Sequence, residues 1–97
     1  MIYSLSPEAD RELTDAVAAY AAQVSVAMAR DFLDTFEKKA LLVAAFPGIG
    51  TVTTRGRRLF PIGRYSYSML YRVEGGVVRI SAIAHHSRRP GYWQGRK

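Results

Sequence analysis

The chain has 97 residues, enough for one domain over residues 1–97, and it has no cysteine, which excludes disulfide frameworks and thiolate metal sites. Its hydrophobic content of 48% argues against intrinsic disorder. No apolar run approaches the ~20 residues that span a bilayer, and the N-terminal residues lack the pattern of a secretory signal. We therefore expect a cytoplasmic protein without a membrane partner.

The net charge of +6 is concentrated in the second half of the chain. Residues 1–54 carry four basic and seven acidic side chains, whereas residues 55–97 carry ten basic and one acidic side chain. The two halves thus contribute −3 and +9, which sum to +6. So strong a cationic half favours polyanions or acidic proteins as partners, although a surface that serves only solubility would have the same composition.

The first half of the chain predicts a strand followed by two helices. Residues 2–5, IYSL, are apolar and β-prone, and Ser6 with Pro7 forms a helix start. One helix from there to Phe46 would be too long for so small a domain, so we place a turn at residues 23–27, QVSVA. The apolar residues at helical spacing form two stripes: Ala9, Leu13, Ala16, Val17, Tyr20, and Ala29, Phe32, Leu33, Phe36, Ala40, Val43.

After the helix stop at residues 47–48, the apolar pattern changes to that of strands. We expect strands over residues 51–60, 64–73 and 77–86, with a hairpin turn at EGG, residues 74–76. The fold class is therefore α+β. An N-terminal strand precedes an antiparallel helical hairpin, which packs on one face of an antiparallel sheet in the order β-α-α-β-β-β.

Alternation along the strands predicts which side chains share a face. The other face of the sheet is expected to leave its arginines and tyrosines exposed, and Tyr65, Tyr67 and Tyr71 share one strand face. In the last strand, one face is expected to hold Val78, Ile80, Ala82 and Ala84, and the other Arg79, Ser81 and His85.

Several segments, in this order, resemble the RelE/ParE superfamily of toxins from bacterial type II toxin–antitoxin systems, with the ParE-like branch favoured. They are LSPEADREL, FPGIG, GRRLFPIGRYSYSMLYRV and VVRISAIAHHSRR, which together cover nearly the whole chain. The resemblance implies a growth-inhibiting toxin of the plasmid-stabilisation type. It also implies that an acidic antitoxin, ParD-like or similar, blocks the toxin in a hetero-oligomer.

The superfamily divides by target. ParE-like members poison DNA gyrase, whereas RelE-like members are endoribonucleases that cut mRNA on the ribosome. The long hairpin and the absence of lysine between Lys39 and Lys97 favour the gyrase poison. The alternatives are the ribosome-dependent nuclease and, third, a non-toxic basic module that binds nucleic acid or protein.

A nuclease of this kind needs a base for the 2′-hydroxyl, cations for the charge of the phosphorane, and an acid for the leaving oxygen. Histidine and arginine suit these roles, and the candidates are Arg58, Arg64, His85, His86 and Arg88. Successive strand residues point to opposite faces, so the two histidines should not share a site or a metal ion. No metal or other cofactor is expected, and one histidine should be half-buried and bonded to backbone.

Two further sets of residues are candidates for contacts with macromolecules. Contact with the target or with nucleic acid would use Arg55, Arg57, Arg58, Arg88, Arg89, Tyr92 and Trp93. Antitoxin binding would use Leu13, Tyr20, Phe32, Tyr65, Tyr67 and Tyr71, although a tyrosine stripe also suits a core. Because unpacked chain ends are usually disordered, we expect Tyr92 or Trp93 to fold back onto the sheet or to be covered by the antitoxin.

Overall fold

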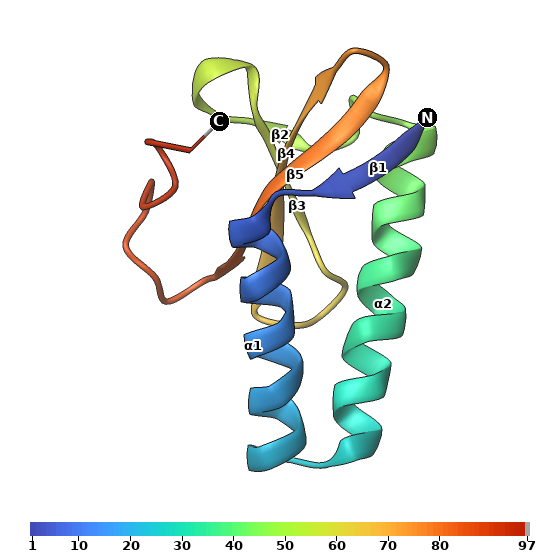
Figure 1. The fold of residues 1–97 in the computed structure, drawn as a ribbon, viewed down its shortest axis with the longest axis vertical. Helices are drawn as coiled ribbons and strands as arrows, with labels where there is room; N and C mark the ends of the chain where they lie inside the picture. Colours follow the sequence, from blue (N-terminus) through green and yellow to red (C-terminus); the bar gives the residue numbers. More distant parts are fainter. Residues whose placement is uncertain (97) are drawn as a thin grey trace.

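A computed structural model describes residues 1–96, in which two helices pack against a five-stranded sheet (Figure 1). The elements are β1 (Ile2–Leu5), α1 (Pro7–Gln23), α2 (Val26–Ala45), β2 (Thr51–Val52), the 3₁₀ turn η1 (Thr54–Gly56), β3 (Arg58–Pro61), β4 (Tyr67–Glu74) and β5 (Val77–His85). The strand order is β1-β5-β4-β3-β2. The expected α+β fold is confirmed, and the sheet is mixed because β1 runs parallel to β5.

Serine caps divide the hairpin into its two helices. The Ser6 hydroxyl accepts a hydrogen bond from the Ala9 amide at 3.1 Å, and the Ser25 hydroxyl accepts one from the Met28 amide at 3.0 Å. Ser25 lies within the turn expected at residues 23–27, so the position of that turn is confirmed. Neither helix within residues 1–96 combines the length and apolarity needed to cross a bilayer.

The single strand expected over residues 51–60 is wrong, because the chain forms two short strands there. Arg55 and Gly56 have φ values of 60° and 71°, in the left-handed region that breaks an extended chain. The chain turns back at η1, so β2 pairs antiparallel with β3. These two strands form the edge of the sheet farthest from β1.

The faces expected for the last strand are wrong beyond Ser81. Tyr71 pairs with Ile80, whereas Leu70 pairs with Ala82, so Ser81 is an extra residue that forms a β-bulge. The bulge exchanges the faces of the residues that follow it. The helix side then receives Ile83, and the other side receives Ala82 and Ala84.

The main core lies between the helices and the sheet. The two predicted stripes are confirmed, with Ala9, Leu13, Ala16, Ala29, Phe32, Phe36, Ala40 and Val43 buried. The expectation of exposed tyrosines is wrong, because Tyr65, Tyr67 and Tyr71 pack on the helix side. The Tyr71 hydroxyl donates to the Pro47 carbonyl at 2.7 Å and accepts from the Gly50 amide at 2.9 Å, which fixes the exit from α2.

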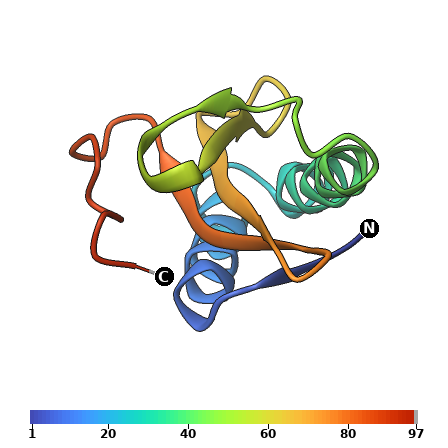
Figure 2. The same ribbon diagram turned by 90° about the horizontal axis from the view of Figure 1, so that it is seen from above.

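The opposite face of the sheet is covered by the C-terminal tail, residues 86–96. Figure 2 shows the tail, in red, on the side of the sheet away from α2. Trp93 is 8% exposed and packs with Leu70, Ala82 and Ala84. The expectation that an aromatic residue of the tail folds back onto the sheet is therefore confirmed.

Candidate functional site

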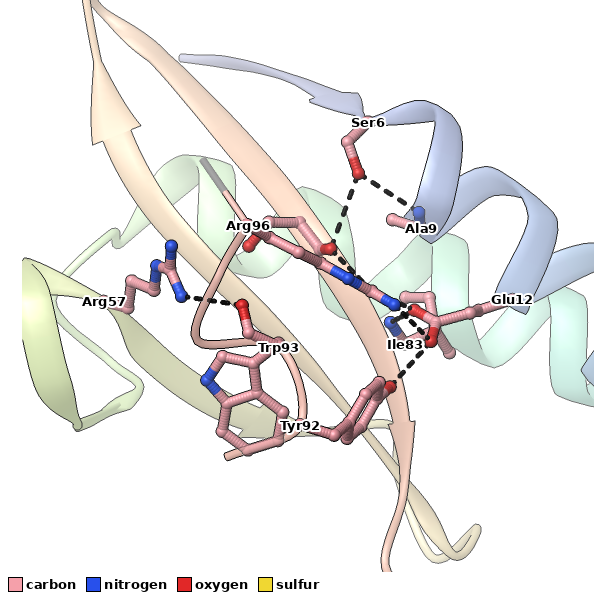
Figure 3. A network of polar contacts seen from close by, with 9 residues as sticks. Ser6, Ala9, Glu12, Arg57, Ile83, Tyr92, Trp93 and Arg96 are labelled. Atoms are coloured by element: carbon pink, nitrogen blue, oxygen red, sulfur yellow. Dashed lines mark hydrogen bonds and ion pairs between the residues drawn. The ribbon is translucent and has the colours of Figure 1, made fainter. Parts of the chain in front are cut away.

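Glu12 on α1 holds the tail in place (Figure 3). Its Oε1 accepts from the Ile83 amide at 3.0 Å and from Arg96 Nη1 at 2.7 Å. Its Oε2 accepts from the Tyr92 hydroxyl at 2.8 Å and from Arg96 Nη2 at 3.2 Å. Because β1 pairs with β5 only as far as Ile80, Glu12 supplies the acceptor that the Ile83 amide lacks at this edge.

These contacts shift the pKa values of the groups involved. Burial alone would raise the pKa of Glu12, but hydrogen bonds from Arg96, Tyr92 and the Ile83 amide, with the charge of Arg96, lower it. Burial, the hydrogen bond to Glu12 and the charge of Glu12 raise the pKa of Tyr92 to about 12. At neutral pH Glu12 is therefore a carboxylate and Tyr92 a neutral phenol that donates to it.

Arg57 lies beneath the tail and is only 2% exposed. Its Nη1 donates to the Trp93 carbonyl at 3.3 Å, as Figure 3 shows. The ion pairs within residues 1–96 involve other arginines, so Arg57 has no carboxylate partner there. Burial lowers the pKa of Arg57, and the positive charges of Arg72 and Arg55 lower it further. The sheet face under the tail is therefore electropositive.

A groove, defined here as the α1 groove, runs along α1 beside the end of β5. It consists of two adjoining hollows of about 440 and 130 Å³ that share Ala19, Tyr67 and His85. Small side chains of α1 line one wall, and Arg88 lies at one end. The wider hollow is also lined by Glu12, Asp15, Ala16, Ile83 and Ser87, and the narrower one by Tyr20, Gln23 and Val24.

The two histidines at the end of β5 face opposite sides of the sheet. His85 lies in the α1 groove with its ring edge-on to Tyr67, at a centroid distance of 4.8 Å. Its Nδ1 accepts from the Ser87 amide at 3.1 Å, so the expected half-buried histidine bonded to backbone is confirmed as His85. His86 is exposed, and its Nε2 lies 2.9 Å from the Ser68 hydroxyl.

The five candidate nuclease residues do not converge on one point. His85 and Arg88 line the same hollow, whereas His86 faces away from it. Arg58 donates to the carbonyls of Gly48 and Gly50, which follow α2, at 3.2 and 2.9 Å. Arg58 is paired with Tyr71 of β4, whereas His85 is paired with Tyr67, four residues away on the same strand. Arg64 is exposed in the turn before β4. Within residues 1–96, no three histidine, aspartate or glutamate side chains gather to hold a metal ion.

Comparisons with known proteins decide the family. The model of the ParE toxin of the type II toxin–antitoxin system parDE matches residues 3–90. The chain belongs to the ParE toxin family. The expected membership of the RelE/ParE superfamily is thereby confirmed, and the protein is the toxin component of a type II toxin–antitoxin system.

A solved structure has the same fold as this ParE-family toxin. It is a chain of the chromosomal ParDE toxin–antitoxin system from P. aeruginosa, with 19% sequence identity and a TM-score of 0.76. The match covers 88% of this toxin and 95% of that chain. A comparison with curated proteins finds no match.

Most residues that we expected to contact an antitoxin lie in the core of the ParE-family fold. Leu13, Phe32, Tyr65 and Tyr71 are at most 9% exposed. Phe32 packs against the rings of Tyr20, Tyr65 and Tyr67 at centroid distances of 5.1 to 5.3 Å. Only Tyr20 and Tyr67 of this set are partly exposed, and both line the α1 groove. Of the six residues expected to contact an antitoxin, these two tyrosines are therefore the ones that a partner could reach.

The expected target-contact residues divide into exposed and covered groups. Arg55, Arg88 and Arg89 are exposed, whereas Arg57 and Trp93 are buried at the tail. The Arg88 guanidinium stacks over the half-buried Tyr92 ring at 4.0 Å from its centroid. Arg55, Arg88 and Arg89 are therefore the exposed cations of this set.

Sequence reasoning missed four charged residues, Glu12, Arg72, Arg79 and Arg96. For Arg72 and Arg79 the sequence contains a signal, the glycine pair at residues 75–76. Both glycines have positive φ, as a two-residue hairpin loop with a type I′ turn requires. Counting outward from such a turn places Arg72 opposite Arg79, as observed. The pairing of Glu12 with Arg96 joins residues 84 positions apart, and no local pattern indicates it.

Proposed function

We propose that this toxin inhibits DNA gyrase without nuclease chemistry. The observation that carries the proposal is the separation of the candidate nuclease residues. Arg58 is held by backbone carbonyls, and His86 faces away from His85. A base, an acid and a phosphate-binding cation are therefore not arranged around one reacting phosphate. Membership of the ParE family supports the same function.

We further propose that gyrase contacts the exposed basic surface around the tail. Arg55, Arg88 and Arg89 are exposed on it, and the Tyr92 ring lies against Arg88. The ten basic residues after position 54 give this half of the toxin its positive potential. Such a surface speeds encounter with an acidic protein or with DNA held by a protein, and it requires no reacting group.

A cognate antitoxin would neutralise the toxin by occupying the α1 groove. The groove offers small apolar side chains from α1 and the partly exposed rings of Tyr20 and Tyr67. Arg88 at its end would pair with an acidic residue of the antitoxin. This arrangement suits a partner whose apolar residues fill the groove while its carboxylates meet the basic end.

One observation favours the second candidate function, a ribosome-dependent mRNA endoribonuclease. His85 and Arg88 line the same hollow, so a proton-transfer group and a phosphate-binding cation border one space. Glu12 and Asp15 line that hollow as well, so two carboxylates accompany the single arginine there and would repel a phosphate. The repulsion makes the nuclease the weaker of the two candidates.

The two functions are distinguished by parallel assays on wild type, His85→Ala, His86→Ala and Arg88→Ala. Gyrase supercoiling and double-strand breaks are measured beside mRNA ends mapped on translating ribosomes. We expect gyrase inhibition and DNA breaks without codon-positioned mRNA cuts, and the inhibition should be weaker in Arg88→Ala, which removes a cation from the proposed contact surface. Arg30→Ala, an exposed change on α2, is the control and should behave as wild type. Ribosome-dependent cuts that fall about a hundredfold in a histidine variant would overturn the proposal.

A further inference from the structure

A row of arginines crosses the tail side of the sheet. Arg72 on β4 lies directly opposite Arg79 on β5. The register of β3 on β4 puts Arg57, which precedes β3, beside Arg72. Like charges that face each other across an antiparallel strand pair destabilise the pair, so negative charge near this row would stabilise the sheet. Glu74 supplies part of that charge, because its Oε2 lies 2.5 Å from Arg72 Nη2.

A hollow of about 490 Å³ opens at the end of this row. Arg72, Arg79 and Arg96 line it from β4, β5 and the tail, so three separate segments bring guanidinium groups to one place. Glu8 and Glu74 are the carboxylates in its wall. Two of these arginines are already paired within residues 1–96, Arg72 with Glu74 and Arg96 with Glu12, so Arg79 is the arginine of this wall that is left for a ligand.

Two residues that line this hollow each have one buried side-chain polar atom without a partner within residues 1–96. These atoms are Nε of Arg72 and the hydroxyl oxygen of Ser81, a residue that is only 2% exposed. Buried polar groups in folded proteins nearly always have a hydrogen-bond partner. Arg79 is exposed and takes part in neither of the ion pairs found within the described residues. The hollow thus offers donors without matching acceptors.

We infer that this hollow binds a phosphate group, with Arg72 and Arg79 as its charged partners and Ser81 as a hydroxyl donor. Guanidinium forks bind phosphate oxygens in pairs, and a tetrahedral phosphate accepts hydrogen bonds from several directions at once. A carboxylate is planar and carries a single charge, so it would satisfy fewer of these donors. The terminal phosphate of a free nucleotide and the backbone phosphate of a nucleic acid share the chemistry that the hollow recognises.

The site is tested on the full chain labelled with ¹⁵N, titrated with inorganic phosphate at constant ionic strength. We expect saturable shifts of the Arg72 Nε–H and Ser81 amide signals. Affinity should fall about tenfold in Arg79→Gln, which loses a charge-assisted contact at an exposed position and should leave the fold intact. Ser81→Ala should weaken binding further when combined with it. Arg96 is left unchanged because it also holds the tail through Glu12.

The charge-matched control is Arg30→Gln on α2, which should bind phosphate like wild type. An equal loss of affinity in Arg30→Gln and Arg79→Gln would show diffuse attraction and overturn the inference. Shifts that do not saturate, or that map away from the hollow, would overturn it as well. ADP and a short single-stranded DNA lacking terminal phosphates are then titrated as competitors of inorganic phosphate. Competition by either ligand supports the site, and the stronger competitor shows which source of phosphate the site prefers.

Discussion

Arg96 and Glu12, 84 residues apart in the sequence, form a bidentate ion pair between the tail and α1. The side chains are only 21% and 16% exposed, so water screens the pair weakly. Glu12 also accepts from the Ile83 amide and the Tyr92 hydroxyl. The tail is therefore an integral part of the folded toxin.

Glu12→Gln should lower the free energy of unfolding by about 2–3 kcal/mol. The substitution removes the negative charge that pairs with Arg96, and it places the NH₂ group of glutamine against side chains that are themselves hydrogen-bond donors. Urea denaturation followed by circular dichroism measures the change. Asp15→Asn is the control, since Asp15 is exposed one turn further along α1, and its effect should stay within about 0.5 kcal/mol. Equal effects of the two substitutions would contradict the role of Glu12.

The stability of the toxin should decrease in acid through the titration of Glu12. Its pKa in the folded toxin lies below the usual value of 4.5, so folding favours the ionised carboxylate. The resulting stability is complete above the unfolded pKa and is lost as pH falls through the lower folded pKa. Between about pH 5 and pH 3, wild type should lose more free energy of unfolding than Glu12→Gln. Parallel pH profiles of the two proteins would assign the titration to other groups.

Trp93 is the only tryptophan, so its fluorescence reports directly on the tail. The free toxin should show the blue-shifted emission of a buried indole, and Arg96→Gln should shift this emission toward that of water-exposed tryptophan. Trp93→Ala should cost about 3 kcal/mol of stability, since the indole packs on Leu70, Ala82 and Ala84. Arg89→Gln, an exposed change in the same tail, should leave the spectrum unaltered. A water-like spectrum of the wild type would refute the packed tail.

Two neighbouring glycines should respond differently to alanine. A Cβ atom at Gly50 would lie 2.6 Å from the Tyr71 hydroxyl and 2.9 Å from the Leu59 carbonyl, whereas nothing lies within 4 Å of one at Gly48. Gly50→Ala should therefore destabilise the toxin by about 1–3 kcal/mol, and Gly48→Ala by less than about 0.5 kcal/mol. Thermal unfolding of the two variants provides the comparison, and similar melting temperatures would argue against the close contact with Tyr71.

Antitoxin association should be fast at low salt and slower at high salt, because the basic half of the toxin attracts an acidic partner over long range. Arg88→Gln should slow association at low salt, while Tyr67→Ala should mainly speed dissociation by removing an apolar contact in the α1 groove. Surface plasmon resonance at two salt concentrations separates the two rates. An association rate that does not vary with salt would remove the electrostatic part of the proposal.

The helices and the helix-side core were predictable because local periodicity encodes them, as with the spacing of Phe32 and Phe36. The opposite orientations of His85 and His86 were also predictable, since neighbouring strand residues alternate wherever the strand begins. The bulge at Ser81 was not, because an extra residue depends on how two strands pair in the folded sheet. The contact of Arg96 with Glu12 was not predictable either, because it depends on the path of the whole chain.

The position of β5 between β1 and β4 makes the order of synthesis matter. The sheet is incomplete until β5, residues 77–85, has been made. Glu12 can form its ion pair only after Arg96, 84 positions later in the chain, has been made. At 5–20 residues per second this interval is roughly 4–17 s. Before β5 has been made, the chain can form α1, α2 and the antiparallel pairs of β2 with β3 and of β3 with β4, whereas β1 still lacks its partner β5. The basic surface around the tail therefore forms only after residue 96 has been made, later than the helices and the first strands.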